Sequence, residues 1–187
     1  MVPKKSSSLY WSLFSYENWK MYIAATHNGI CFIGSQNQPF EELGKWANYY
    51  LPGSDLIRDD EKLQPFADEL VLYFQGKLNR FTIPIFYHGT PFQEAVWKAL
   101  CDIPYGQTRS YSEIAQQIQK PTAVRAIGRA IGANPILITV PCHRVIGKNG
   151  SLTGYRGGME MKTRLLELER DFTNNGKDIL SDQHEHF

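Results

Sequence analysis

Two helix-start signals in the second half of the sequence constrain its fold more than any other feature. Thr90 is followed three residues later by Gln93, and Ser110 is followed three residues later by Glu113. Each pair matches a capping box, in which two side chains satisfy amide groups left free in the first turn of a helix. Pro91 also lies at a first helical position, where its missing amide hydrogen is tolerated. The chain from about Thr90 onward is therefore predicted to be mainly helical.

A further helix is predicted to begin with Thr122 as its N-cap and to end before Asn134. Together with the helix that begins after Ser110, it forms a helix-turn-helix. Because glycine costs about 1 kcal/mol against alanine inside a helix, its two glycines indicate that a nucleic-acid groove or a second helix approaches closely. The face concerned carries two arginines and small residues: Arg125, Ala126, Gly128, Arg129, Ala130 and Gly132.

The first half of the chain is typical of a small α/β domain. Aromatic and β-branched residues between 9 and 33 predict antiparallel strands with a hairpin turn at 27–29. Helices are expected at 41–50 and 65–74, and segment 81–86 is expected to return to the sheet. The predicted organisation is a disordered leader (1–8), an N-terminal α/β domain (9–88), a C-terminal domain (89–171) and a polar tail (172–187).

The segment Val-Pro-Cys-His-Arg-Val-Ile-Gly, which ends at Gly147, holds the best candidate for a reactive group. It follows the apolar run 135–140, which is predicted to be a buried strand, and Pro141 fixes the direction in which Cys142 leaves that strand. A nucleophilic cysteine needs a base or a positive environment, which the next two residues are placed to supply. The alternative is a small core residue, since free cysteines are among the most buried residue types.

A carboxylate for this site is predicted on the last helix, 159–170, where Glu169 lies at the border of the apolar face. Adjacent side chains do not face each other, so Cys142 and His143 are expected to communicate through a bridging water, with Glu169 orienting the imidazole. A solvent-facing glutamate is the alternative. The glycine-rich loop 147–158, which precedes the helix, is expected to approach a flat ligand closely.

The net charge of +1 is distributed unevenly. Residues 120–164 contain eight basic side chains and one acidic one, whereas residues 41–69 contain eight acidic and three basic ones. This basic segment indicates a polyanionic partner, against the alternative of an ordinary solvated surface. No apolar run approaches the ~20 residues of a membrane span, so an intracellular location is expected. The three cysteines are widely spaced, and this spacing argues against a disulfide framework and against a metal site.

The run Pro141-Cys142-His143-Arg144-Val145, with the preceding helix-turn-helix and the following glycine-rich loop, closely resembles the O6-alkylguanine-DNA alkyltransferases, also called methylated-DNA–protein-cysteine methyltransferases. The similarity extends from about Phe92 to Glu169. It implies a C-terminal winged helix-turn-helix domain that carries the active site, and an N-terminal domain that resembles ribonuclease H without its catalytic acids. It further implies a monomer that binds double-stranded DNA containing O6-alkylguanine through the minor groove, in the cytoplasm or, in a eukaryote, the nucleus.

The resemblance also implies a role for each matched residue. Cys142 accepts the alkyl group, His143 takes the thiol proton through a water, Glu169 holds the imidazole, and Asn134 is the hinge behind the active-site turn. Tyr111 hydrogen-bonds the guanine as it leaves. The base pocket is expected to consist of Tyr111, Val145, Tyr155 and Arg156, and the DNA contacts of Thr122, Ala123, Arg125, Ala126, Gly128 and Arg129.

The expected product is a thioether that water does not cleave, so each molecule reacts once, without a cofactor. The zinc site of animal members is not carried over, because Cys31 lacks partners. Three other classes remain as alternatives. A non-catalytic sensor of alkylated DNA would lack Cys142, a plain helix-turn-helix regulator has no use for the glycine-rich loop, and a Cys-His hydrolase would need a distant histidine.

Overall fold

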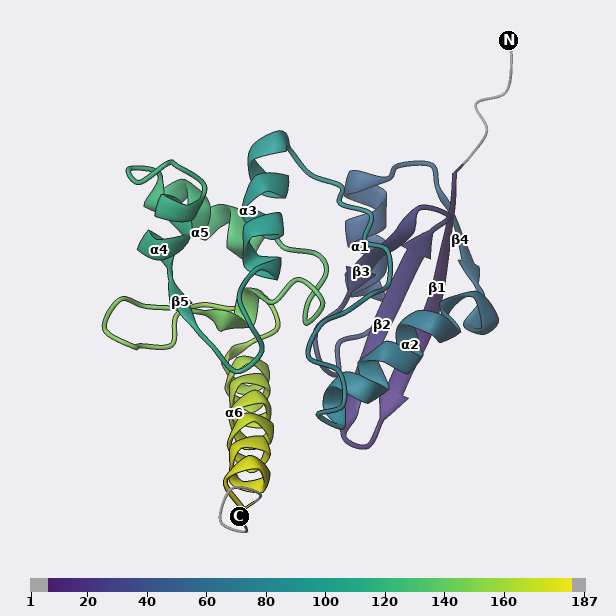
Figure 1. The fold of residues 1–187 in the computed structure, drawn as a ribbon. Coiled ribbons are helices and arrows are strands. Elements are labelled where there is room, and N and C mark those ends of the chain that lie inside the picture. The colour runs from purple at the N-terminus through teal and green to yellow at the C-terminus, as the bar shows by residue number, and fades with distance from the viewer. Residues whose placement is uncertain (1–6, 183–187) are drawn as a thin grey trace.

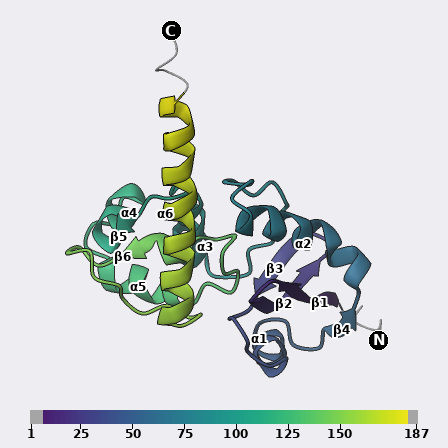
Figure 2. The ribbon, with the colours of Figure 1, turned by 90° about the horizontal axis from the view of Figure 1, so that it is seen from below.

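The N-terminal domain is built on a four-stranded sheet with strand order β3-β2-β1-β4. Strands β1 (Ser8–Tyr16), β2 (Trp19–Thr26) and β3 (Gly29–Ile33) pair antiparallel through two short hairpins, and β4 (Asp55–Arg58) pairs parallel with β1. Helices α1 (Glu41–Tyr50) and α2 (Asp60–Phe74) cover opposite faces of this sheet (Figures 1 and 2). The computed structural model describes residues 7–182, with side chains described as far as residue 176.

The hairpin at 27–29 and α1 are confirmed, but other N-terminal boundaries were wrong. Helix α2 begins five residues before Pro65, because the Asp59 carboxylate accepts a hydrogen bond from Lys62 N (2.9 Å) and caps the helix there. Strand β4 was not predicted, since all four of its residues are exposed and give no alternation. Segment 81–86 contributes a single bridge at Ile85.

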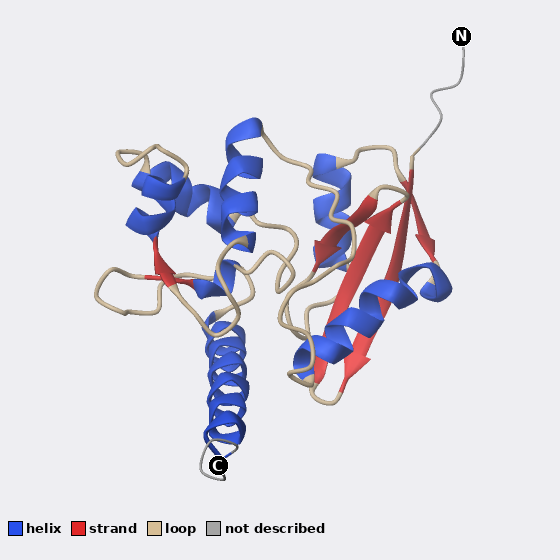
Figure 3. Ribbon diagram, viewed as in Figure 1, coloured by secondary structure: helices blue, strands red, loops and turns tan. Residues whose placement is uncertain are grey.

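The C-terminal domain is mainly helical (Figure 3). Both predicted capping boxes are present, at the starts of α3 (Pro91–Cys101) and α4 (Tyr111–Gln117). Two two-residue strands pair in parallel. One leads into α4, and the other follows the 3-10 turn at Cys142–Arg144, the active-site turn. The elements are α3 (Pro91–Cys101), β5 (Arg109–Ser110), α4 (Tyr111–Gln117), α5 (Val124–Gly132), the 3-10 turn η1 (Cys142–Arg144), β6 (Val145–Ile146) and α6 (Met159–Asp182).

Two helix boundaries predicted in the C-terminal domain were wrong. Thr122 does not cap α5, because a turn closed by Ala123 N and the carbonyl of Lys120 (2.9 Å) delays the helix start to Val124. Helix α6 continues to residue 182, far beyond the predicted end at 170, and Thr173 donates a hydrogen bond to the Glu169 carbonyl (2.7 Å) within it.

The predicted boundaries of the leader and tail therefore change. Strand β1 begins at Ser8, inside the predicted leader, and Ser7 hydrogen-bonds Ser54 (2.9 Å). Much of the predicted polar tail belongs to α6. Residues 1–6 and 183–187 lie outside the described part of the chain.

The outer edge of β3 joins the two domains. Ile33 N donates to the carbonyl of Pro135 (3.0 Å), and Leu137 N donates to the carbonyl of Ile33 (3.3 Å). On the same strand, Ile30 N donates to the carbonyl of Pro84 (2.9 Å). Every residue of β3 is buried, although it is an edge strand, because these segments cover it. The chain just before Cys142 is thus built onto the N-terminal sheet.

Candidate active site

The segment that leads to Cys142 forms a tight turn, so the strand predicted at 135–140 was wrong. Within it, only Ile136 bridges to the sheet, at Ile33. Ile138 has a φ of 68°, in the left-handed region that β-branched residues rarely adopt. This reversal ends the pairing after one bridge and leads the chain into η1. Cys142 therefore begins a 3-10 turn at the domain boundary.

Asn134 holds the sulfur of Cys142. Its Nδ2 donates to Cys142 Sγ (3.2 Å) and to the carbonyl of Val140 (3.0 Å), while its Oδ1 accepts from Ile136 N (2.9 Å). The Asn134 side chain is fully buried, so its amide has little freedom to exchange these partners for solvent. The Asn134 side chain thus stabilises the turn between residues 134 and 142 and also contacts the sulfur.

The sulfur itself is buried, with Cys142 only 2% exposed. Burial raises the pKa of the Cys142 thiol, and the hydrogen bond from Asn134 and the charges of Arg156 and Lys162 oppose this rise without cancelling it. The resting side chain is therefore a thiol at neutral pH. Any nucleophilic reaction at this sulfur requires a base to remove its proton.

The structure brings His143 and Glu169 together. His143 Nε2 lies 2.7 Å from Glu169 Oε1, and both side chains are buried. Burial lowers the pKa of His143, against the opposing effect of the carboxylate, so the ring is neutral at pH 7. An ionised carboxylate only accepts hydrogen bonds, so Nε2 carries the proton and Nδ1 keeps a free lone pair. Nδ1 is buried and has no hydrogen-bond partner among the described residues.

Arg144 does not provide the positive environment at Cys142 that the sequence suggested, because its guanidinium binds Glu169. Its Nε donates to Oε2 (2.9 Å), its Nη2 donates to Oε1 (2.8 Å), and its Nη1 donates to the carbonyl of Ile103 (2.7 Å). Burial would raise the pKa of Glu169, but His143 and Arg144 hold it well below its ordinary value of 4.5. Since Arg144 balances the carboxylate charge, His143 remains neutral.

Tyr73 of α2 is a site residue that the sequence reasoning missed. Its hydroxyl donates to Glu169 Oε1 (2.7 Å) from the N-terminal domain, and Gly106 N approaches Oε2 (3.3 Å) from the other side. Tyr73 lies within the helix predicted at 65–74, and it is fully buried. The one available signal was that a buried tyrosine hydroxyl needs a partner. The carboxylate is therefore held by both domains.

Replacing Tyr73 by phenylalanine is expected to lower the free energy of unfolding by about 1 to 2 kcal/mol, because a buried hydrogen bond to a charged acceptor is lost. Tyr105→Phe is the matched control. The Tyr105 ring lies 5.7 Å from that of Tyr73, and its hydroxyl has no hydrogen-bond partner in the described part of the chain. Denaturant unfolding measures both variants, and equal losses would contradict the assigned role of the Tyr73 hydroxyl.

The glycine-rich loop is tied to the active-site turn. Tyr111, at the start of α4, lies with its hydroxyl 2.6 Å from Thr153 Oγ1. Lys162 of α6 donates to the carbonyls of Val145 (2.6 Å) and Thr153 (3.2 Å), and burial lowers the pKa of its ammonium group. These contacts connect three elements around the predicted pocket, including the predicted residues Tyr111 and Val145. Lys162 was not among the predicted site residues.

The two remaining pocket candidates differ in their surroundings. The Tyr155 hydroxyl is buried, forms no hydrogen bond with a described residue, and has its pKa raised by burial well above 10.0. Arg156 directs its guanidinium to the carbonyl of Asn134 (2.9 Å) and on towards the N-terminal domain. The Arg156 carbonyl also accepts a hydrogen bond from Ser35 (3.4 Å), a residue of the N-terminal domain.

Helix α5 presents an open face. Arg125 and Arg129 are exposed, as is Thr122 just before the helix. A Cβ added at Gly132 would meet nothing within 4 Å, and one at Gly128 would approach only the Tyr111 ring, at 3.9 Å. Among the described residues, no helix packs against Gly132, and Gly128 is approached only by the Tyr111 ring at the start of α4. This openness favours the first of the two interpretations of this face, a nucleic-acid groove. Ala123 and Ala126 are half-buried beside them.

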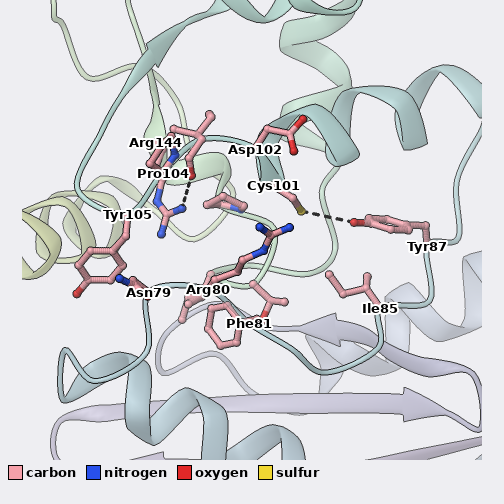
Figure 4. A pocket seen from close by; sticks show the side chains of 14 residues that line it. Asn79, Arg80, Phe81, Ile85, Tyr87, Cys101, Asp102, Pro104, Tyr105 and Arg144 are labelled. Carbon is pink, nitrogen blue, oxygen red and sulfur yellow. Dashed lines mark hydrogen bonds between the residues drawn. The ribbon is translucent and has the colours of Figure 1, made fainter.

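A cleft of about 550 Å³ lies behind the active-site turn, between the two domains (Figure 4). Arg80, Tyr87 and Arg144 line it, and the Tyr87 hydroxyl lies 3.5 Å from the sulfur of Cys101 inside it. Cys142 is absent from its lining residues. This cleft is thus separate from the predicted base pocket.

Cys31 is a core residue of the N-terminal sheet. Burial raises the pKa of Cys31 to about 12, and its sulfur lies 3.5 Å from the carbonyl of Ala24 in the sheet core. Within the described residues, no three His, Cys, Asp or Glu side chains lie close enough to hold a metal ion. No helix in this described part of the chain is both long enough and apolar enough to cross a membrane.

Comparison with known proteins agrees with this geometry. Residues 91–171 match the family described as the DNA binding domain of 6-O-methylguanine DNA methyltransferase, and residues 9–87 match its ribonuclease-like domain. The chain is 64% identical over 163 residues to the inducible methylated-DNA–protein-cysteine methyltransferase of Bacillus subtilis, covering 87% of this chain and 91% of that protein. The corresponding protein of Methanosarcina acetivorans is 38% identical over 163 residues, which cover 86% and 98% of the two chains.

Solved structures give the same result. The O6-methylguanine methyltransferase of Mycobacterium tuberculosis is 40% identical, with a TM-score of 0.71 over 87% of this chain and 93% of that one. A second structure from that organism, OGT in complex with DNA, has a TM-score of 0.72 at 39% identity, over 87% and 94% of the chains. Since both domains and nearly the whole length agree, the chain belongs to the family of methylated-DNA–protein-cysteine methyltransferases.

Proposed function

We propose that Cys142 is the residue that accepts the alkyl group from O6-alkylguanine in DNA, within the repair reaction of this family. The observation that carries this assignment is the arrangement around the sulfur. Asn134 donates to Sγ (3.2 Å), and the adjacent His143 is held neutral by Glu169 (2.7 Å). Cys31 and Cys101 have no such neighbours among their described contacts.

The proton of Cys142 leaves through His143. The Nδ1 lone pair of the neutral imidazole accepts it through one water, as expected for adjacent side chains that do not face each other. Glu169 stabilises the imidazolium that results, while its own charge is already balanced by Arg144. Charge therefore appears on the histidine only when the thiol ionises.

The thiolate then attacks the alkyl carbon in line with the bond to O6. A sulfur–carbon bond forms, the carbon–oxygen bond breaks, and its electron pair moves into the guanine. Tyr111 donates a hydrogen bond to the departing base, which takes up a proton from water and becomes ordinary guanine. The imidazolium of His143 returns the thiol proton to water, so the protons balance. For this, the Tyr111 hydroxyl exchanges its present partner, Thr153, for the base. Backbone groups of Val145, Tyr155 and Arg156 line the pocket and read the base edge.

The product at Cys142 is a thioether, which offers water no leaving group. Each molecule therefore repairs one lesion, and the DNA supplies everything that the reaction needs besides the protein. We propose that a monomer suffices, because one chain carries the thiol, the base and the DNA-binding helix. The protein then acts wherever its DNA resides, in the cytoplasm or in a eukaryotic nucleus.

The alkylated nucleotide must leave the duplex to reach Cys142, which costs a few kcal/mol of unstacking. We propose that the small-residue face of α5 lies in the minor groove and that Arg125 occupies the space vacated in the base stack. The exposed Arg125 and the uncovered Gly132 support this orientation. The remaining contacts are assigned to the neighbouring residues Thr122, Ala123, Ala126, Gly128 and Arg129.

Replacing Arg125 by alanine is expected to slow repair about tenfold at low DNA concentration, since stacking on a base contributes roughly 1 to 3 kcal/mol. Arg170→Ala removes another exposed arginine, from α6, and serves as the control. The rate of repair against DNA concentration measures both variants. An unchanged rate for Arg125→Ala would contradict its placement in the stack.

The proposed function is tested by supplying a tenfold excess of duplex DNA that carries one O6-methylguanine. The expected result is that repair stops when one lesion per protein molecule has been converted to guanine. Continued turnover would contradict the proposed function, because the methyl group would then have to leave Cys142 again. Tight binding without conversion would place the chain with the non-catalytic sensors.

A further inference from the structure

The Arg156 side chain joins three backbone carbonyls that belong to both domains. Its Nε donates to the carbonyl of Asn134 (2.9 Å), and its Nη2 donates to the carbonyls of Ile33 (2.8 Å) and Pro135 (3.2 Å). Ile33 ends the edge strand of the N-terminal sheet, whereas Asn134 contacts the reactive sulfur. The guanidinium thus lies where the sheet edge meets the active-site turn.

The N-terminal domain holds this guanidinium from its other side. The Arg156 Cζ lies 5.4 Å from the centre of the Phe32 ring, and Nη1 lies 3.7 Å from Glu42 Oε1. The same Glu42 oxygen accepts a hydrogen bond from Ser35 N (2.8 Å), and the Ser35 hydroxyl donates to the Arg156 carbonyl (3.4 Å). Arg156 is therefore clamped at its backbone and at its side chain.

We propose that Arg156 is a positioning residue, whose side chain holds Asn134 against Cys142. Through this side chain the N-terminal sheet supports the geometry of the active site. This inference rests on the proposed role of Cys142 as acceptor. It differs from the pocket role assigned to the Arg156 backbone, because it concerns the side chain.

A guanidinium fits this role better than an ammonium group does. Its planar fork sends donors in fixed directions to several acceptors, whereas a lysine ammonium is a point charge on a flexible stem. Losing the fork leaves the carbonyls of Ile33, Asn134 and Pro135 without these donors. Arg156 also contributes positive charge near the sulfur, one of the influences that oppose the raised pKa of Cys142.

The test compares Arg156→Gln and Arg156→Lys with the matched control Arg164→Gln. Arg164 also crosses between the domains, with its Cζ 4.1 Å from the centre of the Trp19 ring, but it lies on α6 and makes no described hydrogen bond to Asn134. Alkyl transfer is measured at saturating DNA, and DNA affinity is measured separately. We expect Arg156→Gln to slow transfer about tenfold with little change in affinity, and Arg156→Lys to recover part of the rate.

A second readout follows Cys142 without DNA. Iodoacetamide labelling of the Cys142 peptide is measured against pH by mass spectrometry, and its midpoint is expected to rise in Arg156→Gln but not in Arg164→Gln. Transfer rates and midpoints that are equal in these two variants would overturn the inference. A wild-type protein that transfers no alkyl group would instead overturn the proposed function, so the two failures are distinguishable.

Discussion

Replacing Cys142 by alanine is expected to abolish alkyl transfer while DNA that carries the lesion remains bound. A methyl side chain cannot form the thioether, but Arg125 and the rest of the α5 face, proposed to bind the DNA, are unchanged. Because the removed sulfur is buried, the free energy of unfolding is expected to fall by only about 1 kcal/mol. The measurements are repair of an O6-methylguanine duplex and binding of the same duplex in a gel-shift experiment.

Cys101→Ala is the control for this prediction. Cys101 is half-buried and its sulfur contacts only the Tyr87 hydroxyl among its described hydrogen-bond partners, so its loss is expected to leave transfer intact. Transfer that persists in Cys142→Ala and disappears in Cys101→Ala would make Cys101 the acceptor. It would also contradict the proposed role of His143 as the base that removes the thiol proton.

Replacing Glu169 by glutamine is expected to slow transfer about 100-fold and to lower the free energy of unfolding by about 3 kcal/mol. Two effects combine, since the buried Arg144 loses its counter-charge and His143 loses the carboxylate that stabilises its charged form. Both the transfer rate at saturating DNA and denaturant unfolding measure this variant. Glu167→Gln, an exposed position on the same helix, is the control and is expected to change neither quantity.

The pH dependence of stability gives a further signature of Glu169. Its pKa in the folded protein lies below the ordinary 4.5, so its contribution to stability is complete above that pH. The contribution is lost as the pH falls through the folded-state pKa and the carboxylate is protonated. Wild-type protein should therefore lose more stability on acidification below pH 4.5 than Glu169→Gln does. Parallel losses in the two proteins would contradict the buried ion pair.

The parts of the fold that the sequence predicted correctly depend on local signals. The capping boxes at Thr90 and Ser110 need only side chains three residues apart, and both are present. Glu169 was found because helical periodicity placed it at the edge of a buried face. The prediction of a strand before Cys142 was wrong because Ile138 adopts a positive φ. No pattern in the sequence indicates a positive φ at this residue.

The missing parts of the site depend on distant contacts. Tyr73 meets Glu169 across 96 residues, and Arg156 meets Ile33 across 123. Local sequence patterns do not predict such pairs. Each residue taken alone has only the pattern of a core residue or of a surface residue. Arg144 was assigned to the thiol for a related reason, since it lies only two residues from Cys142 in the sequence but its partner in space is Glu169.

The central claim is that Cys142 is the alkyl acceptor. The most direct measurement is peptide-resolved mass spectrometry after incubation with duplex DNA carrying one O6-methylguanine. The account predicts that the Cys142 peptide exchanges one hydrogen for one methyl group, to completion, while the Cys31 and Cys101 peptides keep their mass. Methylation of either other peptide, or none despite tight lesion binding, would contradict it.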